Sequence, residues 1–109
     1  MSIQTINRFE TTPSNDSPNG MHKTGELRNI TAIDIEEVLG FKPNYDDDPA
    51  KVVNSWLFKV RDVTDPESKP VLCGIWDYKG SHHFNQFSTY GPHDLLNDLF
   101  FGHYHGRVY

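Results

Sequence analysis

Residues 71–90 read Val-Leu-Cys-Gly-Ile-Trp-Asp-Tyr-Lys-Gly-Ser-His-His-Phe-Asn-Gln-Phe-Ser-Thr-Tyr, and this segment carries the clearest strand pattern in the chain. The first eight residues form two alternating sets, in which Val71, Cys73 and Ile75 oppose Leu72, Trp76 and Tyr78. Alternation of this kind is typical of a strand. The glycine turn at residues 79–81 then predicts an antiparallel return over residues 83–90. Two neighbouring strands are therefore expected here.

A third strand precedes this pair. In residues 55–60, the side chains of Trp56, Phe58 and Val60 share one face of an extended segment. Residues 61–70 are polar and contain two prolines, so they are expected to form a loop. Together the three segments predict a three-stranded antiparallel meander.

Helix signals flank the meander on both sides. Thr31 and Asp34 have the spacing of a capping box, and Gly40 supplies a left-handed stop. Pro92 and Gly102 bracket a second helical stretch. The expected apolar faces are Ala32, Ile35, Val38 and Leu39 in the first helix, and Leu95, Leu96, Leu99 and Phe100 in the second. Phe101 points away from the second face, so it packs against the tail or lies exposed.

The order α-β-β-β-α predicts a small α+β domain with two short helices packed on one face of the meander. The length of 109 residues fits one domain. Residues 11–20 contain no apolar residue and many turn formers, so residues 1–25 are expected to be a flexible N-terminal arm. The domain is then expected to cover residues 26–109.

The composition indicates in which cellular environment the chain is expected to fold. One cysteine, Cys73, cannot form an intramolecular disulfide, and its place in an apolar strand favours a buried structural role over a nucleophilic one. The N-terminus lacks a secretory leader pattern, and no apolar run reaches the roughly 20 residues that span a bilayer. We therefore expect a soluble, cytoplasmic protein that does not enter a membrane.

The net charge of −5 is concentrated in residues 31–50, which hold one basic and six acidic side chains. An acidic total argues against binding to a nucleic-acid backbone and favours a basic protein partner. The alternative is that these carboxylates form a solvated face. Asp46, Asp47 and Asp48 do not have the spacing of an EF-hand calcium loop. They are candidate partner-binding residues.

Aromatic side chains are too numerous for two short helices to cover. The meander alone contains Trp56, Phe58, Trp76 and Tyr78. Aromatic surfaces often carry interface hot spots, so these four residues are predicted to contact a partner. The alternatives are that the N-terminal arm folds over them, or that a homodimer covers them.

Histidine is the main candidate for metal chemistry. His103 and His105 lie on one side of an extended segment, as two ligands of a metal site would. Asp77 with His82 or His83 could also act as an orienting group and a base across the hairpin turn. No nucleophile elbow or phosphate loop accompanies these residues. The sequence therefore predicts no cofactor, and a small His-dependent metal hydrolase or nuclease stays an alternative.

The segments "GFKPNYDDDPAKVVNSWLFKV", "GIWDYKGS" and "FSTYGP" resemble pieces of small phage-encoded accessory proteins of unassigned role. The resemblance covers roughly residues 40–92. It implies a protein that binds and modulates or blocks a host protein. We therefore expect a non-enzymatic protein-binding accessory protein, with the metal enzyme and a small-molecule-binding module with an aromatic pocket as alternatives.

Overall fold

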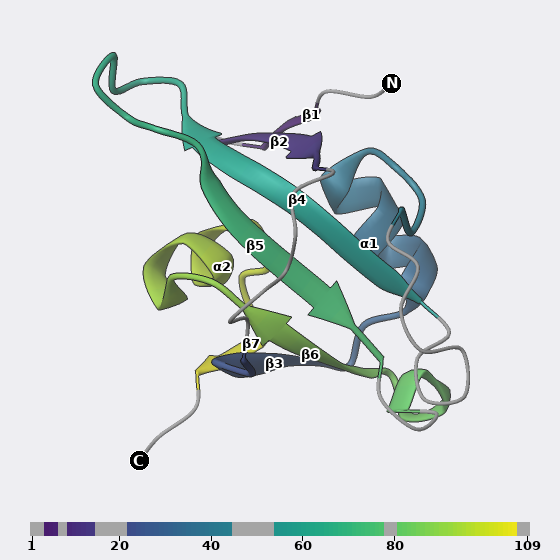
Figure 1. Cartoon of the computed structure of the whole chain (residues 1–109). Coiled ribbons are helices and arrows are strands. Elements are labelled where there is room, and N and C mark those ends of the chain that lie inside the picture. The colour runs from purple at the N-terminus through teal and green to yellow at the C-terminus, as the bar shows by residue number, and fades with distance from the viewer. Residues whose placement is uncertain (1–3, 7–8, 15–21, 45–53, 78–80, 107–109) are drawn as a thin grey trace.

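The computed structural model describes residues 4–6, 9–14, 22–44, 54–77 and 81–106. They form a seven-stranded sheet in the order β1-β2-β4-β5-β6-β3-β7, in which every pair of neighbours is antiparallel (Figure 1). The strands are β1 (Gln4–Ile6), β2 (Phe9–Pro13), β3 (Gly25–Arg28), β4 (Ser55–Asp62), β5 (Val71–Trp76), β6 (Gln86–Tyr90) and β7 (Tyr104–Gly106). Two helices, α1 (Ala32–Leu39) and α2 (His93–Leu99), complete the domain.

The centre of the sheet consists of β4, β5 and β6, the three segments that the alternation pattern identified. Phe58 lies opposite Cys73 in the first pairing, and Gly74 lies opposite Tyr90 in the second. The third strand is shorter than expected, because Ser81–Phe84 form a 3₁₀ helix. Asn85 then takes a positive φ of 57° before β6 begins at Gln86.

The expectation of a three-stranded meander with two helices packed on one face and a flexible N-terminal arm is wrong. Four further strands extend the meander, so the domain is mostly sheet. β1 and β2 come from the segment that was expected to be an arm, and β2 pairs with β4 along its whole length. β3 pairs with β6 on one side and with β7 on the other.

A buried polar residue explains why the sequence analysis did not predict β2. Thr11 is fully buried, although the segment that begins with it has no apolar side chain. Its hydroxyl donates to the backbone oxygen of Leu39 at 2.8 Å. This bond satisfies a carbonyl at the end of α1, which has no partner within the helix. β2 is therefore held by hydrogen bonds as well as by the burial of Phe9.

The first helix forms where its end signals predicted. Thr31 accepts from the backbone N–H of Asp34, and the Asp34 carboxylate accepts from the N–H of Thr31, so the capping box is confirmed. Gly40 ends the helix with a φ of 90°, a conformation that glycine adopts without strain. Ile35 and Leu39 are buried, and Ala32 and Val38 pack against the core.

The second helix also occupies the predicted stretch, but it is shorter than its end signals indicated. It ends at Leu99, with the Phe100 N–H donating to the Leu96 oxygen at 2.9 Å. Gly102 has its positive φ in the turn beyond the helix. Leu96, Leu99 and Phe100 are buried, which confirms most of the expected apolar face.

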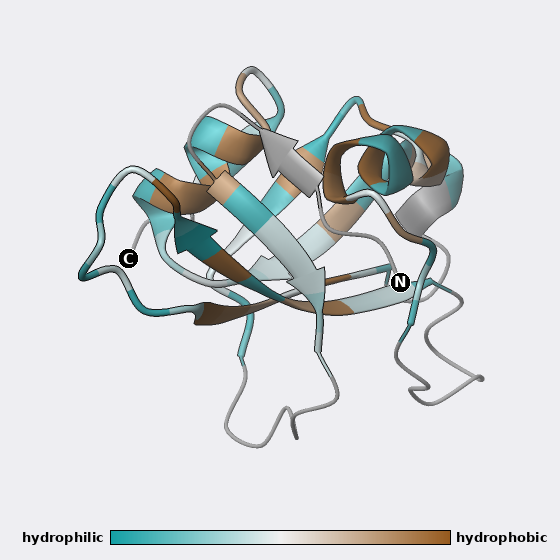
Figure 2. Cartoon of the chain, turned by 90° about the horizontal axis from the view of Figure 1, so that it is seen from above, coloured by the Kyte–Doolittle hydropathy of each residue, from teal (hydrophilic) through white to brown (hydrophobic). Residues whose placement is uncertain are grey.

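One core joins the helices to the sheet. It contains Ile35 and Leu39 of α1, Leu96 and Leu99 of α2, and strand residues that include Trp56, Phe58 and Phe87. The rings of Trp56 and Phe87 meet edge to face, with centroids 6.0 Å apart. Figure 2 shows the hydrophobic colour on parts of both helices and of several strands. Within the described ranges, no helix is long and apolar enough to cross a membrane.

Candidate partner-binding groove

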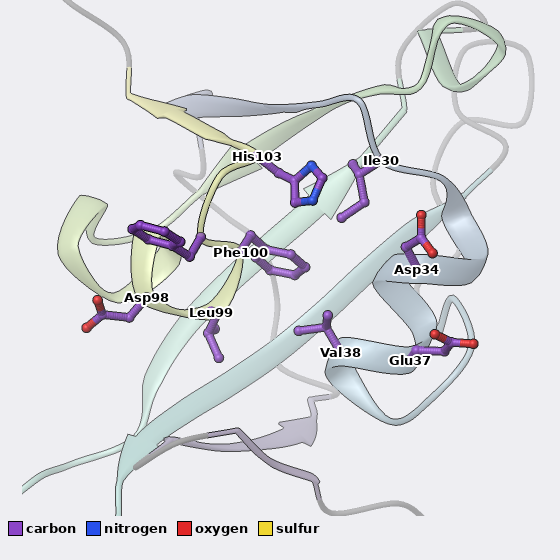
Figure 3. Close-up of a pocket in the computed structure, with 9 residues that line it drawn as sticks. Ile30, Asp34, Glu37, Val38, Asp98, Leu99, Phe100 and His103 are labelled. Atoms are coloured by element: carbon purple, nitrogen blue, oxygen red, sulfur yellow. The ribbon is translucent and has the colours of Figure 1, made fainter.

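A groove lies between α1 and the turn that follows α2 (Figure 3). Its volume is about 480 Å³. Nine described residues line it: Ile30, Asp34, Glu37, Val38, Asp98, Leu99, Phe100, Phe101 and His103. We call this feature the helix groove.

The floor of the helix groove is apolar because three side chains of the core reach it. Ile30, Leu99 and Phe100 are each at most 4 % exposed and also line the groove. Val38 of α1 packs against the same core and forms part of one wall. An occupant with an apolar side chain would therefore find a preformed hydrophobic surface.

The turn after α2 determines which of two adjacent phenylalanines is buried. The Phe100 oxygen accepts from the backbone N–H groups of both His103 and Tyr104, which fixes a tight turn. Gly102 takes a φ of 87° there. The turn holds Phe100 in the core at 2 % exposure and leaves Phe101 at 81 % exposure beside the groove.

A second exposed apolar side chain lies near the opposite wall. Ile33 is 67 % exposed on α1. It precedes Glu37 by four residues, so the two side chains are neighbours on the helix surface. Ile33 is therefore an exposed apolar side chain that neighbours one residue of the groove lining. Such an exposed patch next to a concave apolar surface is typical of an interaction site.

The rim of the helix groove is acidic. Asp34 and Glu37 come from α1 and Asp98 from α2, and the nine lining residues include neither lysine nor arginine. Hydrogen bonds from the backbone and the hydroxyl of Thr31 lower the pKa of the Asp34 carboxyl below its ordinary value. Desolvation of the carboxyl opposes this effect, and the nearby His103 imidazole adds to it. The three carboxylates therefore favour a cationic occupant at neutral pH.

His103 supplies the remaining polar group of the groove. Its Nδ1 lies 3.0 Å from the backbone oxygen of Arg28, and its own backbone oxygen accepts from the Arg28 N–H at 2.9 Å. The side chain is therefore fixed to the end of β3. Figure 3 shows its ring between Ile30 and Phe100 at one end of the groove.

The structure describes three of the residues that were predicted to contact a partner, namely Trp56, Phe58 and Trp76. Trp56 and Phe58 are at most 1 % exposed in the core, so they cannot contact a partner in the folded domain. Trp76 is half-buried at the end of β5. Asp46, Asp47, Asp48 and Tyr78 lie outside the described residues. The acidic segment nevertheless contributes Asp34 and Glu37 to the groove.

The fold places the two predicted metal ligands in different surroundings. The His103 ring lines the groove, whereas His105 is exposed on β7 opposite Glu26 of β3. The described part of the chain holds no cluster of three or more His, Cys, Asp and Glu side chains with the geometry of a metal site. The geometry therefore gives the hydrolase alternative no support.

The remaining chemical candidates have structural roles. Cys73 is fully buried in β5, and this burial raises the pKa of its thiol from 9.0 to about 12. Such a thiol stays protonated and is a poor nucleophile at neutral pH. Asp77 is also fully buried, and one of its oxygens accepts both the backbone N–H and the side-chain amide of Asn54. It holds the end of β5 to the start of β4.

Comparison with known proteins finds no match: no protein-family model, curated protein or solved structure matches this chain. The groove is therefore interpreted from its own residues. Sequence analysis did not find it, because its two walls come from α1 and from the turn after α2. The sequence offered one signal, Phe101, which lies off the apolar face that was predicted for the second helix.

Proposed function

We propose that the chain is a non-enzymatic protein-binding module whose helix groove takes a cationic, apolar segment of a partner protein. The supporting observation is the combination in one groove of a buried apolar floor, three rim carboxylates and the exposed Phe101. The apolar surface supplies affinity by excluding water, and the carboxylates select for lysine and arginine.

The acidic rim also distinguishes this occupant from a second copy of the chain. In a symmetric dimer through the groove, the same surface of each copy would face the other. The acidic rim of one copy, with Asp34, Glu37 and Asp98, would then face the same acidic surface of the other, and like charges at an interface are repulsive. The net charge of −5 adds to this repulsion at longer range. A basic partner avoids both effects.

The proposed role agrees with the resemblance to phage-encoded accessory proteins, which implies binding to a host protein. A host protein segment that carries lysine or arginine around apolar anchors would suit the groove. We place this interaction in the cytoplasm, where an unpaired cysteine such as Cys73 stays reduced.

A synthetic peptide can test the proposal without knowledge of the partner. The probe is a fluorescein-labelled amphipathic peptide of about 14 residues, with leucine at every third or fourth position and lysine elsewhere. Fluorescence anisotropy measures its binding to the wild-type protein. We expect saturable binding that weakens as sodium chloride is added, because salt screens exposed charges. A peptide with glutamate in place of lysine should not bind.

Matched variants then locate the binding surface. Phe101→Ala should weaken binding about tenfold or more, as truncation of an aromatic anchor does. Phe84→Ala is the control, since Phe84 is 78 % exposed and is absent from the groove lining. Likewise, Asp98→Asn should weaken binding, whereas Glu67→Gln in the exposed loop after β4 should not. Equal binding by Phe101→Ala, Asp98→Asn and the wild type would contradict the proposal.

A further inference from the structure

The residues of α1 that line the helix groove follow the period of a helix. Asp34, Glu37 and Val38 are three and four residues apart, and Ile30 precedes Asp34 by four residues. Side chains at this spacing are neighbours on one face of a helix. Figure 3 shows the Val38 side chain pointing from α1 toward Phe100. One wall of the groove is therefore a stripe along α1, a helix of eight residues that is about 12 Å long.

The volume of the groove suits side chains better than a whole peptide segment. A helix with its side chains is about 10–12 Å wide. The volume of about 480 Å³ is instead in the range of a pocket that holds one small ligand. An occupant therefore lies over the groove and inserts the apolar side chains of one face into it.

The backbone around the groove favours an occupant that satisfies its own polar groups. None of the nine described lining residues belongs to a strand, so they offer no strand edge for pairing. The Glu36 oxygen accepts from the Gly40 N–H at 2.7 Å, and the Phe100 oxygen accepts from His103 and Tyr104. An extended segment would therefore place unpaired N–H and C=O groups against the apolar floor, which is costly. A helix pairs these groups internally.

We infer that the occupant of the helix groove is a basic amphipathic helix that lies along α1 and inserts its apolar stripe between α1 and the turn after α2. This inference rests on the proposed function, because it concerns the same groove. Helices that bind in this way carry apolar anchors at intervals of three, four and seven residues. Asp34 and Glu37, which lie on one face of α1, attract lysine or arginine side chains that flank those anchors.

Two peptides of identical composition test the inference. The first is the leucine–lysine peptide described above, with leucine at every third or fourth position. The second has the same leucines at every second position, as one face of a strand requires. Both peptides carry the same charge, so a difference in affinity reports the spacing of the apolar side chains. We expect the first to bind about tenfold more tightly or better in fluorescence anisotropy.

A helix-breaking replacement gives a matched control within the first peptide. Proline in place of the central lysine should weaken binding about tenfold or more, because proline interrupts a helix. Alanine at the same position removes the same charge and keeps the helix, so it should weaken binding much less. Equal effects of proline and alanine would overturn the inference.

Nuclear magnetic resonance shows the conformation and the place of the bound peptide. The Cα chemical shifts of the ¹³C-labelled first peptide should become helical when the unlabelled protein is added. With a methyl-labelled protein, the leucines of the peptide should show nuclear Overhauser effects to Val38 and Leu99, which line the groove. Val63 is the control, since it is 40 % exposed directly after β4 and does not line the groove.

The outcomes separate the inference from the proposed function. Equal affinity of the two peptides, tighter binding of the second, or extended Cα shifts in the bound first peptide would overturn the inference and leave the proposed function intact. Absence of binding by both peptides, or contacts to Val63 in place of Val38, would instead reject the proposed function, and the inference with it.

Discussion

The side-chain amide of Asn44 pairs with both backbone polar groups of Leu57. Its Nδ2 donates to the Leu57 oxygen at 2.8 Å, and the Leu57 N–H donates to its Oδ1 at 2.9 Å. The peptide group of a neighbouring strand would make the same two bonds. β2 ends at Pro13, opposite Phe58, so Asn44 takes over at the position where the strand partner of β4 ends.

Removal of this amide should destabilise the domain. Asn44→Ala leaves the Leu57 N–H without this acceptor, and we expect a loss of about 1–3 kcal/mol in the free energy of unfolding. Urea denaturation followed by circular dichroism measures the change. Asn97→Ala is the control, because Asn97 is exposed on α2 and its change should stay within about 0.5 kcal/mol. Equal stability of the two variants would contradict the assigned role of Asn44.

The Asp77 carboxylate should have a similar role at the other end of β4. Asp77→Ala removes the oxygen that accepts the Asn54 N–H at 3.1 Å and the Asn54 amide at 2.9 Å. Because Asp77 is fully buried, water cannot easily replace these bonds, and we expect a loss of about 2–3 kcal/mol. Asp77→Asn keeps one oxygen and should lose less.

A matched carboxylate can check this interpretation. Asp65 accepts the Glu67 N–H at 2.9 Å in the exposed loop after β4. Asp65→Ala therefore removes the same kind of bond in a place that water reaches, and it should cost about 1 kcal/mol or less. Chemical denaturation of both variants gives the comparison. A cost for Asp65→Ala that equals the cost for Asp77→Ala would argue against burial as the cause.

Gly91 should not tolerate a side chain. It has a φ of 144°, and a Cβ atom added there would lie 2.7 Å from the Cys73 sulfur. Gly91→Ala should therefore destabilise the domain by about 2–4 kcal/mol through backbone strain and a steric clash. Gly102→Ala separates the two causes, because Gly102 has a φ of 87° but no atom within 4 Å of its added Cβ. Thermal denaturation should show the smaller loss for Gly102→Ala.

The buried thiol of Cys73 should make the domain less stable in alkaline solution. Its pKa rises from 9.0 to about 12 on folding, so the folded state retains a proton that the unfolded state loses. The stabilisation is complete below pH 9 and disappears as the pH rises toward 12. Between pH 8.5 and 10.5 we expect a loss of about 2 kcal/mol from this group. Cys73→Ala should show a correspondingly flatter dependence when unfolding is measured across this range.

Local signals predicted the elements that depend on local chemistry. The capping box of Thr31 and Asp34 and the stop at Gly40 are both confirmed. These features depend on residues a few positions apart. The three central strands, β4, β5 and β6, also follow one another along the chain, so each lies next to its sequence neighbour in the sheet.

Features that depend on distant residues were not predictable in this way. β2 contains Thr11, Thr12 and Pro13, a composition that favours a turn, and its partner β4 lies about 50 residues further along the chain. β7 is three residues long and pairs with β3, not with the strand that precedes it. The helix groove combines residues from Ile30 to His103, and nothing in their spacing indicates that they meet.

The strand order also determines when the chain can fold during synthesis. Gly25 of β3 pairs with Thr89 of β6, and Phe9 of β2 pairs with Asp62 of β4. Ribosomes add about 5–20 residues per second, so β3 waits several seconds for its partner. During this interval the buried Leu27 has no sheet to pack against. The nascent β3 segment therefore stays accessible to chaperones until β6 has left the ribosome.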